Sequence, residues 1–200
     1  MKKFLQLNRI PLLLTISAFL FYWSFAYDLD RGDFLKLVSL YAGLFFLSWK
    51  LIQLKKNSFW FLAGVALIFR FIFIGSIPNL SQDFYRFIWD GRMLLNGFNP
   101  FLSVPAEFIT AGEAPVSQAK ELYRGMGELN AGNYTNYPPL HQLIFALSAI
   151  IGGKSIIGSI IVMRVVIIAA DFGILYFGKK ILEKMQLLYT GSFGLFLIPL

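Results

Sequence analysis

The stretch IPLLLTISAFLFYWSFAY, residues 10–27, contains 18 consecutive residues without a charge. A transmembrane helix needs about 20 predominantly apolar residues, so this run is long enough to cross a bilayer. Three basic residues precede it, namely Lys2, Lys3 and Arg9. The small residues Ser24 and Ala26, at a plausible cleavage spacing, leave a cleaved signal peptide as the alternative. The bulky aromatic residues at 21–23, just before that site, favour an uncleaved first span.

The composition of the whole chain agrees with a membrane protein. Of the 200 residues, 57% are hydrophobic and 14% are charged, whereas soluble domains carry about 25% charged residues. This excludes a disordered chain and a typical cytosolic enzyme. The chain has no cysteine and one histidine, which excludes disulfides, cysteine-based zinc sites and histidine-rich metal sites. We interpret the net charge of +7 as a feature of membrane topology and expect no binding to nucleic acid.

Two further apolar runs, 34–54 and 59–77, predict a second and a third span. The segment 1–78 is therefore expected to hold three transmembrane helices. Residues 79–138 are polar and net acidic, and they form a loop domain outside the hydrocarbon. Because basic residues gather on the cytoplasmic side, the N-terminus is predicted to be cytoplasmic and the loop external.

The segment 139–200 predicts further transmembrane helices, but its topology stays open. If both 140–151 and 156–177 cross the membrane, the lysines that follow lie outside, against the positive-inside rule. The first of these runs is short enough to be re-entrant, although Gly152-Gly153-Lys154-Ser155 resembles a hairpin turn and slightly favours two crossings. A last apolar run, 187–200, stops before a full span. We therefore expect the N-terminal part of a longer protein, inactive or weakly active alone.

The most informative polar stretch is SQDFYRFIWDGR, residues 81–92, followed by GFNPF at 97–101. Ser81 is predicted to cap a new helix, which places Asp83 in the first turn, near the positive end of the helix dipole. Asp83, Arg86 and Asp90 then share one face, and aromatic residues fill another. Such a helix is expected to lie flat at the membrane interface. From the residues alone, these charges are either catalytic or simply exposed to water.

The same residues resemble a known family. The pattern DFYRFIWDGR, then GFNPF, then Tyr137-Pro138-Pro139-Leu140 is similar to the polytopic mannosyltransferases of the GT-C superfamily, over roughly residues 70–185. The resemblance implies an all-α, GT-C-like transmembrane bundle with a large external loop that carries interfacial helices. It also implies a donor that is a polyprenyl-phosphate sugar. Many relatives carry two adjacent acids where this chain has Gln82 and Asp83, which weakens any metal-binding role for an acidic pair.

The resemblance implies that Asp83 is the catalytic base. The substrate-binding candidates are residues of the same helix and of the Tyr-Pro-Pro motif: Arg86, Asp90, Arg92, Tyr85, Trp89, Tyr137 and His141. For Asp90, the alternative to substrate binding is to orient an arginine. For Tyr85 and Trp89 we favour membrane anchoring over stacking on a sugar, and for His141 an ordinary interfacial position. No metal site and no cofactor is expected, because polyprenyl phosphate is already a good leaving group.

Ionisable groups inside apolar runs are costly, so they mark protein interiors or functional sites. Arg70 and Arg164 are candidates for binding the donor phosphate. A structural alternative is favoured for Arg164, because Asp171 lies seven residues later on the same helix face and could pair with it.

These observations predict an inverting glycosyltransferase that moves a hexose, mannose by the resemblance, from a polyprenyl-phosphate donor to a glycan or lipid acceptor. The expected location is the bacterial plasma membrane, with catalysis on its outer face. The expected partners are membrane lipid, the donor and the acceptor. The alternatives are a transporter or flippase for a lipid-linked or anionic substrate, which the charges within the spans favour, and a non-catalytic membrane scaffold.

Overall fold

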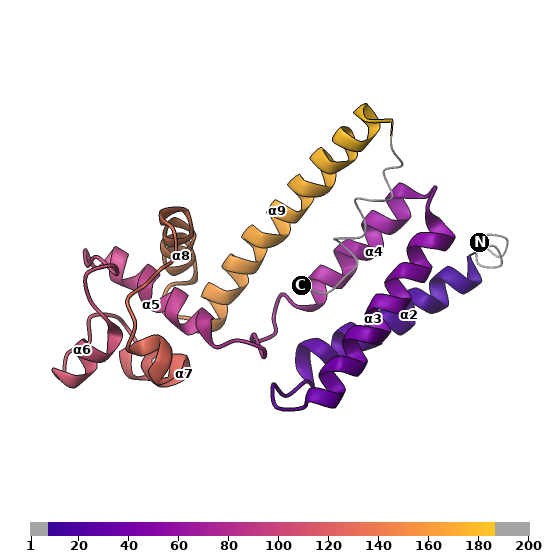
Figure 1. Ribbon diagram of the computed structural model, residues 1–200. Coiled ribbons are helices and arrows are strands. Elements are labelled where there is room, and N and C mark those ends of the chain that lie inside the picture. Colours follow the sequence, from indigo (N-terminus) through magenta and orange to yellow (C-terminus); the bar gives the residue numbers. More distant parts are fainter. Residues whose placement is uncertain (1–7, 187–200) are drawn as a thin grey trace. The chain divides into compact units, whose positions relative to one another are not determined.

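The computed structural model describes residues 8–186, and every regular element within them is a helix (Figure 1). The helices form two compact units. One holds residues 8–76 together with 168–186, and the other holds residues 77–167. The long helix α9 (Ile156–Lys184) contributes its first part to the second unit and its last part to the first unit. The predicted all-α architecture is confirmed, and the apolar run 187–200 lies outside the described residues.

The first unit contains α2 (Arg9–Tyr27), α3 (Phe34–Lys55) and α4 (Phe59–Ile72) beside the end of α9. Three helices of the described chain, α2, α3 and α9, are long and apolar enough to cross a membrane. The first two match the predicted runs 10–27 and 34–54. Helix α4 ends at Ile72, five residues before the predicted end of its run, and successive turns continue to Ser76.

Contacts at the two ends of this unit give the helix directions. The Tyr27 hydroxyl, at the end of α2, donates to the Ile72 carbonyl oxygen at the end of α4 over 2.8 Å. At the opposite end, Lys55 Nζ donates to Asn8 Oδ1, beside the start of α2. Helices α2 and α4 therefore run parallel. Helix α3 runs antiparallel to both and leads from the end of α2 to the start of α4.

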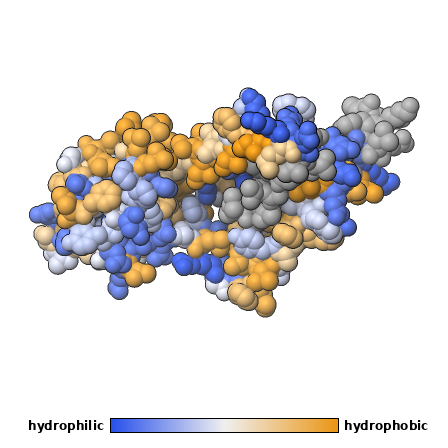
Figure 2. All heavy atoms as spheres, turned by 45° about the horizontal axis from the view of Figure 1, so that its top comes forward, coloured by the Kyte–Doolittle hydropathy of each residue, from blue (hydrophilic) through white to orange (hydrophobic). Residues whose placement is uncertain are grey.

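Figure 2 shows large apolar areas beside polar ones on this face of the described chain. Large hydrophobic side chains of α2 and α3 point away from their own unit; Ile16 and Leu20 are 57% and 61% exposed, and Leu35 is 78% exposed. In water such surfaces would aggregate, whereas acyl chains solvate them at no cost. The chain is thus an all-α integral membrane protein.

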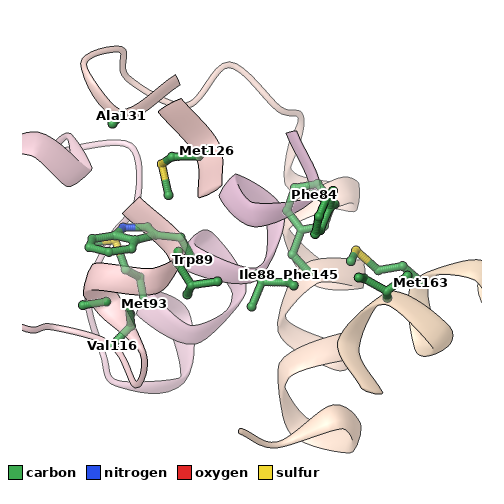
Figure 3. Packing of buried hydrophobic residues seen from close by; sticks show 12 residues of the cluster. Phe84, Ile88, Trp89, Met93, Val116, Met126, Ala131, Phe145 and Met163 are labelled. Carbon is green, nitrogen blue, oxygen red and sulfur yellow. The ribbon is translucent and has the colours of Figure 1, made fainter. Parts of the chain in front are cut away.

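The second unit contains α5 (Asp83–Leu95), α6 (Pro105–Thr110), α7 (Ala119–Ala131), α8 (Pro139–Gly152) and the start of α9. The turn predicted at 152–155 is present between α8 and α9. Helix α5 is the centre of this unit. Figure 3 shows Ile88 between two groups of buried side chains, with Trp89 and Met93 on one side and Phe84 and Phe145 on the other.

That α5 lies flat at the membrane interface stays a prediction, and within its own unit the helix is packed on two sides. Neighbouring helices bury both the apolar face and the charged face of α5. The buried charged residues are Arg86, Asp90 and Arg92. The amphipathic pattern reflects two different protein surroundings, one apolar and one polar.

Candidate functional site

The site is built around Asp83, the first residue of α5. Ser81 does not stand directly before the helix as predicted; Gln82 does, and the Ser81 hydroxyl accepts the Asp83 backbone N–H over 3.2 Å. The half-buried Asp83 carboxylate lies in the first turn, where the helix dipole favours negative charge. Asn130 Nδ2 donates to its Oδ1 over 2.7 Å. Among the described residues nothing donates to Oδ2, so one oxygen is held and the other is available.

Helix α7 carries Asn130, and close contacts with α5 set its position. Gln82 Nε2 donates to the Met126 carbonyl oxygen over 2.9 Å. The adjacent Gly127 has φ +73°, and a Cβ there would lie 2.6 Å from Gln82 Nε2. At Gly125 a Cβ would lie 2.6 Å from the Tyr85 ring. Tyr85 thus packs on α7, and Gln82 anchors the helix that holds Asn130.

A buried polar network lies one turn further along α5. Arg86 Nε donates to Asp90 Oδ1 over 2.7 Å, and both side chains are almost fully buried. Arg86 Nη1 also donates to the carbonyl oxygens of Asn130 and Asn133, each over 2.7 Å. Gln142 Nε2, from α8, donates to Asp90 Oδ2 over 3.0 Å. Asp90 therefore orients an arginine, and Arg86 binds the end of α7 that carries Asn130.

Two of the predicted substrate-binding residues have structural surroundings instead. Trp89 is completely buried in the unit's core, so the prediction that it anchors the helix in the membrane or stacks on a sugar is wrong. Arg92 is 4% exposed and donates to the carbonyl oxygens of Ser117, at 2.7 Å, and Gly153, at 3.3 Å. Burial also lowers the pKa of Arg92 below its ordinary value. Arg92 thus joins α5 to the α8–α9 turn.

Two cavities of different character lie near Asp83, and Tyr137 lines both of them. The first, of about 480 Å³, is almost wholly apolar, with His141 and Arg164 as its basic side chains. The second, of about 510 Å³, is polar and is lined by Arg86 and the segment that follows α7. Its remaining lining residues are Leu129, Asn130, Asn133, Tyr134, Thr135 and Asn136.

The pKa of Tyr137 reflects the charges around these two cavities. Burial raises the pKa of its phenol above the ordinary value, and the negative charges of Asp83 and Asp90 raise it further. The phenol therefore stays protonated and can donate a hydrogen bond at neutral pH. The Tyr137 phenol, which lines both cavities, thus lies within the electrostatic influence of the Asp83 carboxylate.

The charges within the spans pair differently from the prediction. Asp171 Oδ2 accepts a hydrogen bond from Arg70 Nε over 2.9 Å, within the first unit, so the expected pairing of Asp171 with Arg164 is wrong. Both partners are mostly buried, at 14% and 16% exposure. The periodicity of one helix could not reveal a partner on α4. Arg164 instead lines the apolar cavity.

The described residues contain no group of three or more histidine or carboxylate side chains that could hold a metal ion. Sequence reasoning missed Asn130, Gln142 and Thr135, whose amide and hydroxyl groups complete the polar network. Gln142 Nε2 donates to Thr135 Oγ1 over 3.0 Å as well as to Asp90. Isolated amide side chains form no sequence motif that marks them as part of a site. The signal for Gln142 is its place shortly after the Tyr-Pro-Pro motif.

Fold and site together define an all-helical membrane protein in which a carboxylate at a helix N-terminus lies near an apolar and a polar cavity. Residues 18–197 match the family described as alpha-(1->6)-mannopyranosyltransferase, N-terminal domain, and the chain belongs to that family. It is thus a mannosyltransferase of the GT-C type, as the resemblance implied. No curated protein and no solved structure matches the chain.

Proposed function

We propose that this chain transfers mannose from a polyprenyl phosphate to a hydroxyl group of a glycan or lipid acceptor, with Asp83 as the general base. The observation that carries the proposal is the Asp83 carboxylate, which Asn130 holds by one oxygen beside two cavities. General bases must lie within hydrogen-bond reach of the proton they remove, and the second oxygen of Asp83 is available for that contact.

The proposed reaction is a single displacement. The acceptor oxygen attacks the anomeric carbon, its proton passes to Asp83 Oδ2, and the bond between that carbon and the phosphate oxygen breaks. Polyprenyl phosphate leaves with its electron pair, so the configuration at the anomeric carbon inverts. Negative charge grows on the phosphate as it leaves, and nearby cations or donors stabilise it.

The apolar cavity suits the donor. Its walls match an isoprenoid chain, and Arg164 and His141 are the lining side chains that could meet a phosphate. Arg70 has no part in this proposal, because Asp171 engages its guanidinium in the other unit. The same ion pair accounts for two of the three intramembrane charges that favoured a transporter, Arg70 and Asp171.

The polar cavity suits the acceptor. Amide and hydroxyl side chains such as Asn136, Thr135 and Tyr134 donate to and accept from sugar hydroxyls. Arg86 lines the cavity, but its charge is already matched by Asp90. The lining therefore favours a neutral glycan acceptor over an anionic one.

We place catalysis on the non-cytoplasmic face. Lys50 and Lys55 lie in the last turns of α3 and Lys56 follows it, at the end of the first unit that also holds the start of α2. Basic residues favour the cytoplasm. The segment that carries Asp83 follows α4 at the opposite end. Nucleotide sugars are absent on that face, so the donor there is lipid-linked.

The test is a donor panel with membranes that contain the protein, with wild type and Asp83→Asn in parallel. Radiolabelled mannose and glucose are offered on polyprenyl phosphate and on a nucleoside diphosphate. We expect transfer from polyprenyl-phosphate mannose by wild type and a loss of at least a hundredfold in Asp83→Asn. Transfer from the nucleotide donor alone, or equal transfer by both proteins, contradicts the proposal.

A further inference from the structure

We propose that Tyr134 binds the acceptor, because its ring gives the polar cavity a flat surface on which a pyranose sugar stacks. The inference rests on the proposed function, in which this cavity takes the acceptor. It adds the residue that selects a sugar ring over an acceptor whose hydroxyl group lies on a flexible chain.

The first observation is the place of Tyr134. It lies in the segment between α7 and α8, outside any helix, and it lines the polar cavity of about 510 Å³. Its side chain is 59% exposed, whereas Trp89 of the same unit is completely buried. Single exposed aromatic residues are common on protein surfaces, so exposure alone assigns no role. What distinguishes Tyr134 is that its ring lines a cavity and that its backbone is held.

The backbone on both sides of Tyr134 is fixed by the buried polar network. The Asn133 carbonyl oxygen accepts a hydrogen bond from Arg86 Nη1 over 2.7 Å. The buried Thr135 hydroxyl accepts one from Gln142 Nε2 over 3.0 Å. Loop residues are usually mobile, but here both neighbours are held. The ring therefore keeps only its two side-chain torsions, and binding through it costs little conformational entropy.

The cavity that Tyr134 lines also reaches the proposed base. Asn130 lines the same cavity and donates to Asp83 Oδ1 over 2.7 Å. A sugar bound in this cavity therefore lies next to the side chain that holds Asp83. This is where the proposed reaction needs the acceptor hydroxyl.

The lining matches the chemistry of a sugar ring. A pyranose carries hydroxyl groups around its edge and C–H groups on its faces. The electron-rich face of an aromatic ring attracts C–H groups, which carry partial positive charge. The amides of Asn133 and Asn136 suit the hydroxyl groups at the edge, and Leu129 adds apolar surface. A lipid chain in the same place would leave these amides without hydrogen bonds.

The test is the acceptor dependence of transfer by the full chain in detergent, with polyprenyl-phosphate mannose as donor and a soluble mannose disaccharide as acceptor. We expect Tyr134→Ala to raise the acceptor KM about tenfold, with the donor KM nearly unchanged. Tyr134→Phe keeps the ring, so its acceptor KM should stay close to that of wild type. The matched control is Tyr176→Ala in α9. Tyr176 is similarly exposed, at 54%, but it belongs to the other unit and lines neither cavity.

Two outcomes overturn the inference. An unchanged acceptor KM in Tyr134→Ala does so, and it is the result expected if the ring only anchors the segment at the membrane interface. An equal rise in Tyr134→Ala and Tyr134→Phe also does so, because the hydroxyl rather than the ring would then bind the acceptor.

A binding measurement separates this inference from the proposed function. Saturation-transfer NMR uses the purified full chain and the same disaccharide, without donor. We expect the protein to saturate the C–H protons of one sugar face, and Tyr134→Ala to lose most of that signal. Failure of the proposed function appears instead as no transfer by wild type from polyprenyl-phosphate mannose, with the binding signal retained. An equal signal in wild type and Tyr134→Ala overturns the role of Tyr134 whatever the donor.

Discussion

At the scale of single residues, the site depends on how Asp83 is held. A carboxylate at the start of a helix would rotate freely if nothing fixed it, and its free oxygen would then point correctly only part of the time. Asn130 removes that freedom with one hydrogen bond of 2.7 Å. A neutral donor fixes the geometry without adding a positive charge beside the base, and this distinguishes Asn130 from an arginine at the same place.

Replacing Asn130 by Ala is therefore expected to lower kcat by about tenfold to a hundredfold, since small misplacements of a catalytic group cost up to about a hundredfold. KM for the donor should change little. Steady-state transfer assays separate the two constants. The control is Asn96→Ala, which removes a comparable hydrogen bond, to the Pro115 carbonyl oxygen, at the far end of α5. Equal kcat values for the two variants would show that Asn130 does not position the base.

The Arg86–Asp90 pair should matter for stability, because it is buried. Removing one partner of such a pair leaves an uncompensated charge and costs about 3–5 kcal/mol. We expect Asp90→Ala to lower the unfolding midpoint in detergent clearly. The control is Asp28→Ala, which removes a pair with Lys36 of the same length, 2.7 Å, at an exposed site. Similar midpoints for the two variants would contradict this account of the network.

Tyr137 gives a pH dependence whose sign follows from its raised pKa. The folded protein keeps the phenolic proton at pH values where the unfolded chain has lost it. The contribution of Tyr137 to the free energy of unfolding is therefore complete below a pH of about 10. It decreases as the pH rises toward the pKa of the folded protein. We expect Tyr137→Phe to weaken the loss of thermal stability between about pH 9.5 and 11. An unchanged alkaline slope would show that Tyr137 does not contribute in this way.

At the scale of helices, glycine decides how closely α5 and α8 approach. A Cβ on Gly91 would lie 2.2 Å from the Phe145 carbonyl oxygen, which is backbone and cannot turn aside. We expect Gly91→Ala to destabilise the fold by about 1–3 kcal/mol, as overpacking does. The matched control is Gly64→Ala in α4, where nothing lies within 4 Å and alanine should be neutral or slightly stabilising. Chemical unfolding in detergent measures both, and a stable Gly91→Ala protein would refute the close crossing.

The same scale shows what the sequence could and could not predict. Continuous apolar runs identified α2, α3 and α9 well, because a span needs nothing but length and hydrophobicity. The surroundings of α5 were not predictable, since its amphipathic pattern fits a membrane surface and a polar protein interior equally. The motif pointed to Asp83, but Asn130 and Gln142 came from distant segments that only folding brings together.

At the scale of the whole molecule, the chain assigns separate tasks to its two units. The first supplies apolar helices, a buried Arg70–Asp171 pair and lysines at one end. The second supplies the carboxylate and both cavities. Under the proposed function, the segment that carries Asp83 lies on the non-cytoplasmic side. A base there can meet a sugar that is still attached to its carrier lipid.

The most direct test of the central claim measures kcat for Asp83→Asn with saturating polyprenyl-phosphate mannose, alongside donor affinity and the unfolding midpoint. The account predicts a fall in kcat of at least a hundredfold with the other two quantities nearly unchanged, and partial recovery in Asp83→Glu. A kcat within a few-fold of wild type in Asp83→Asn would contradict the assignment of Asp83 as the base.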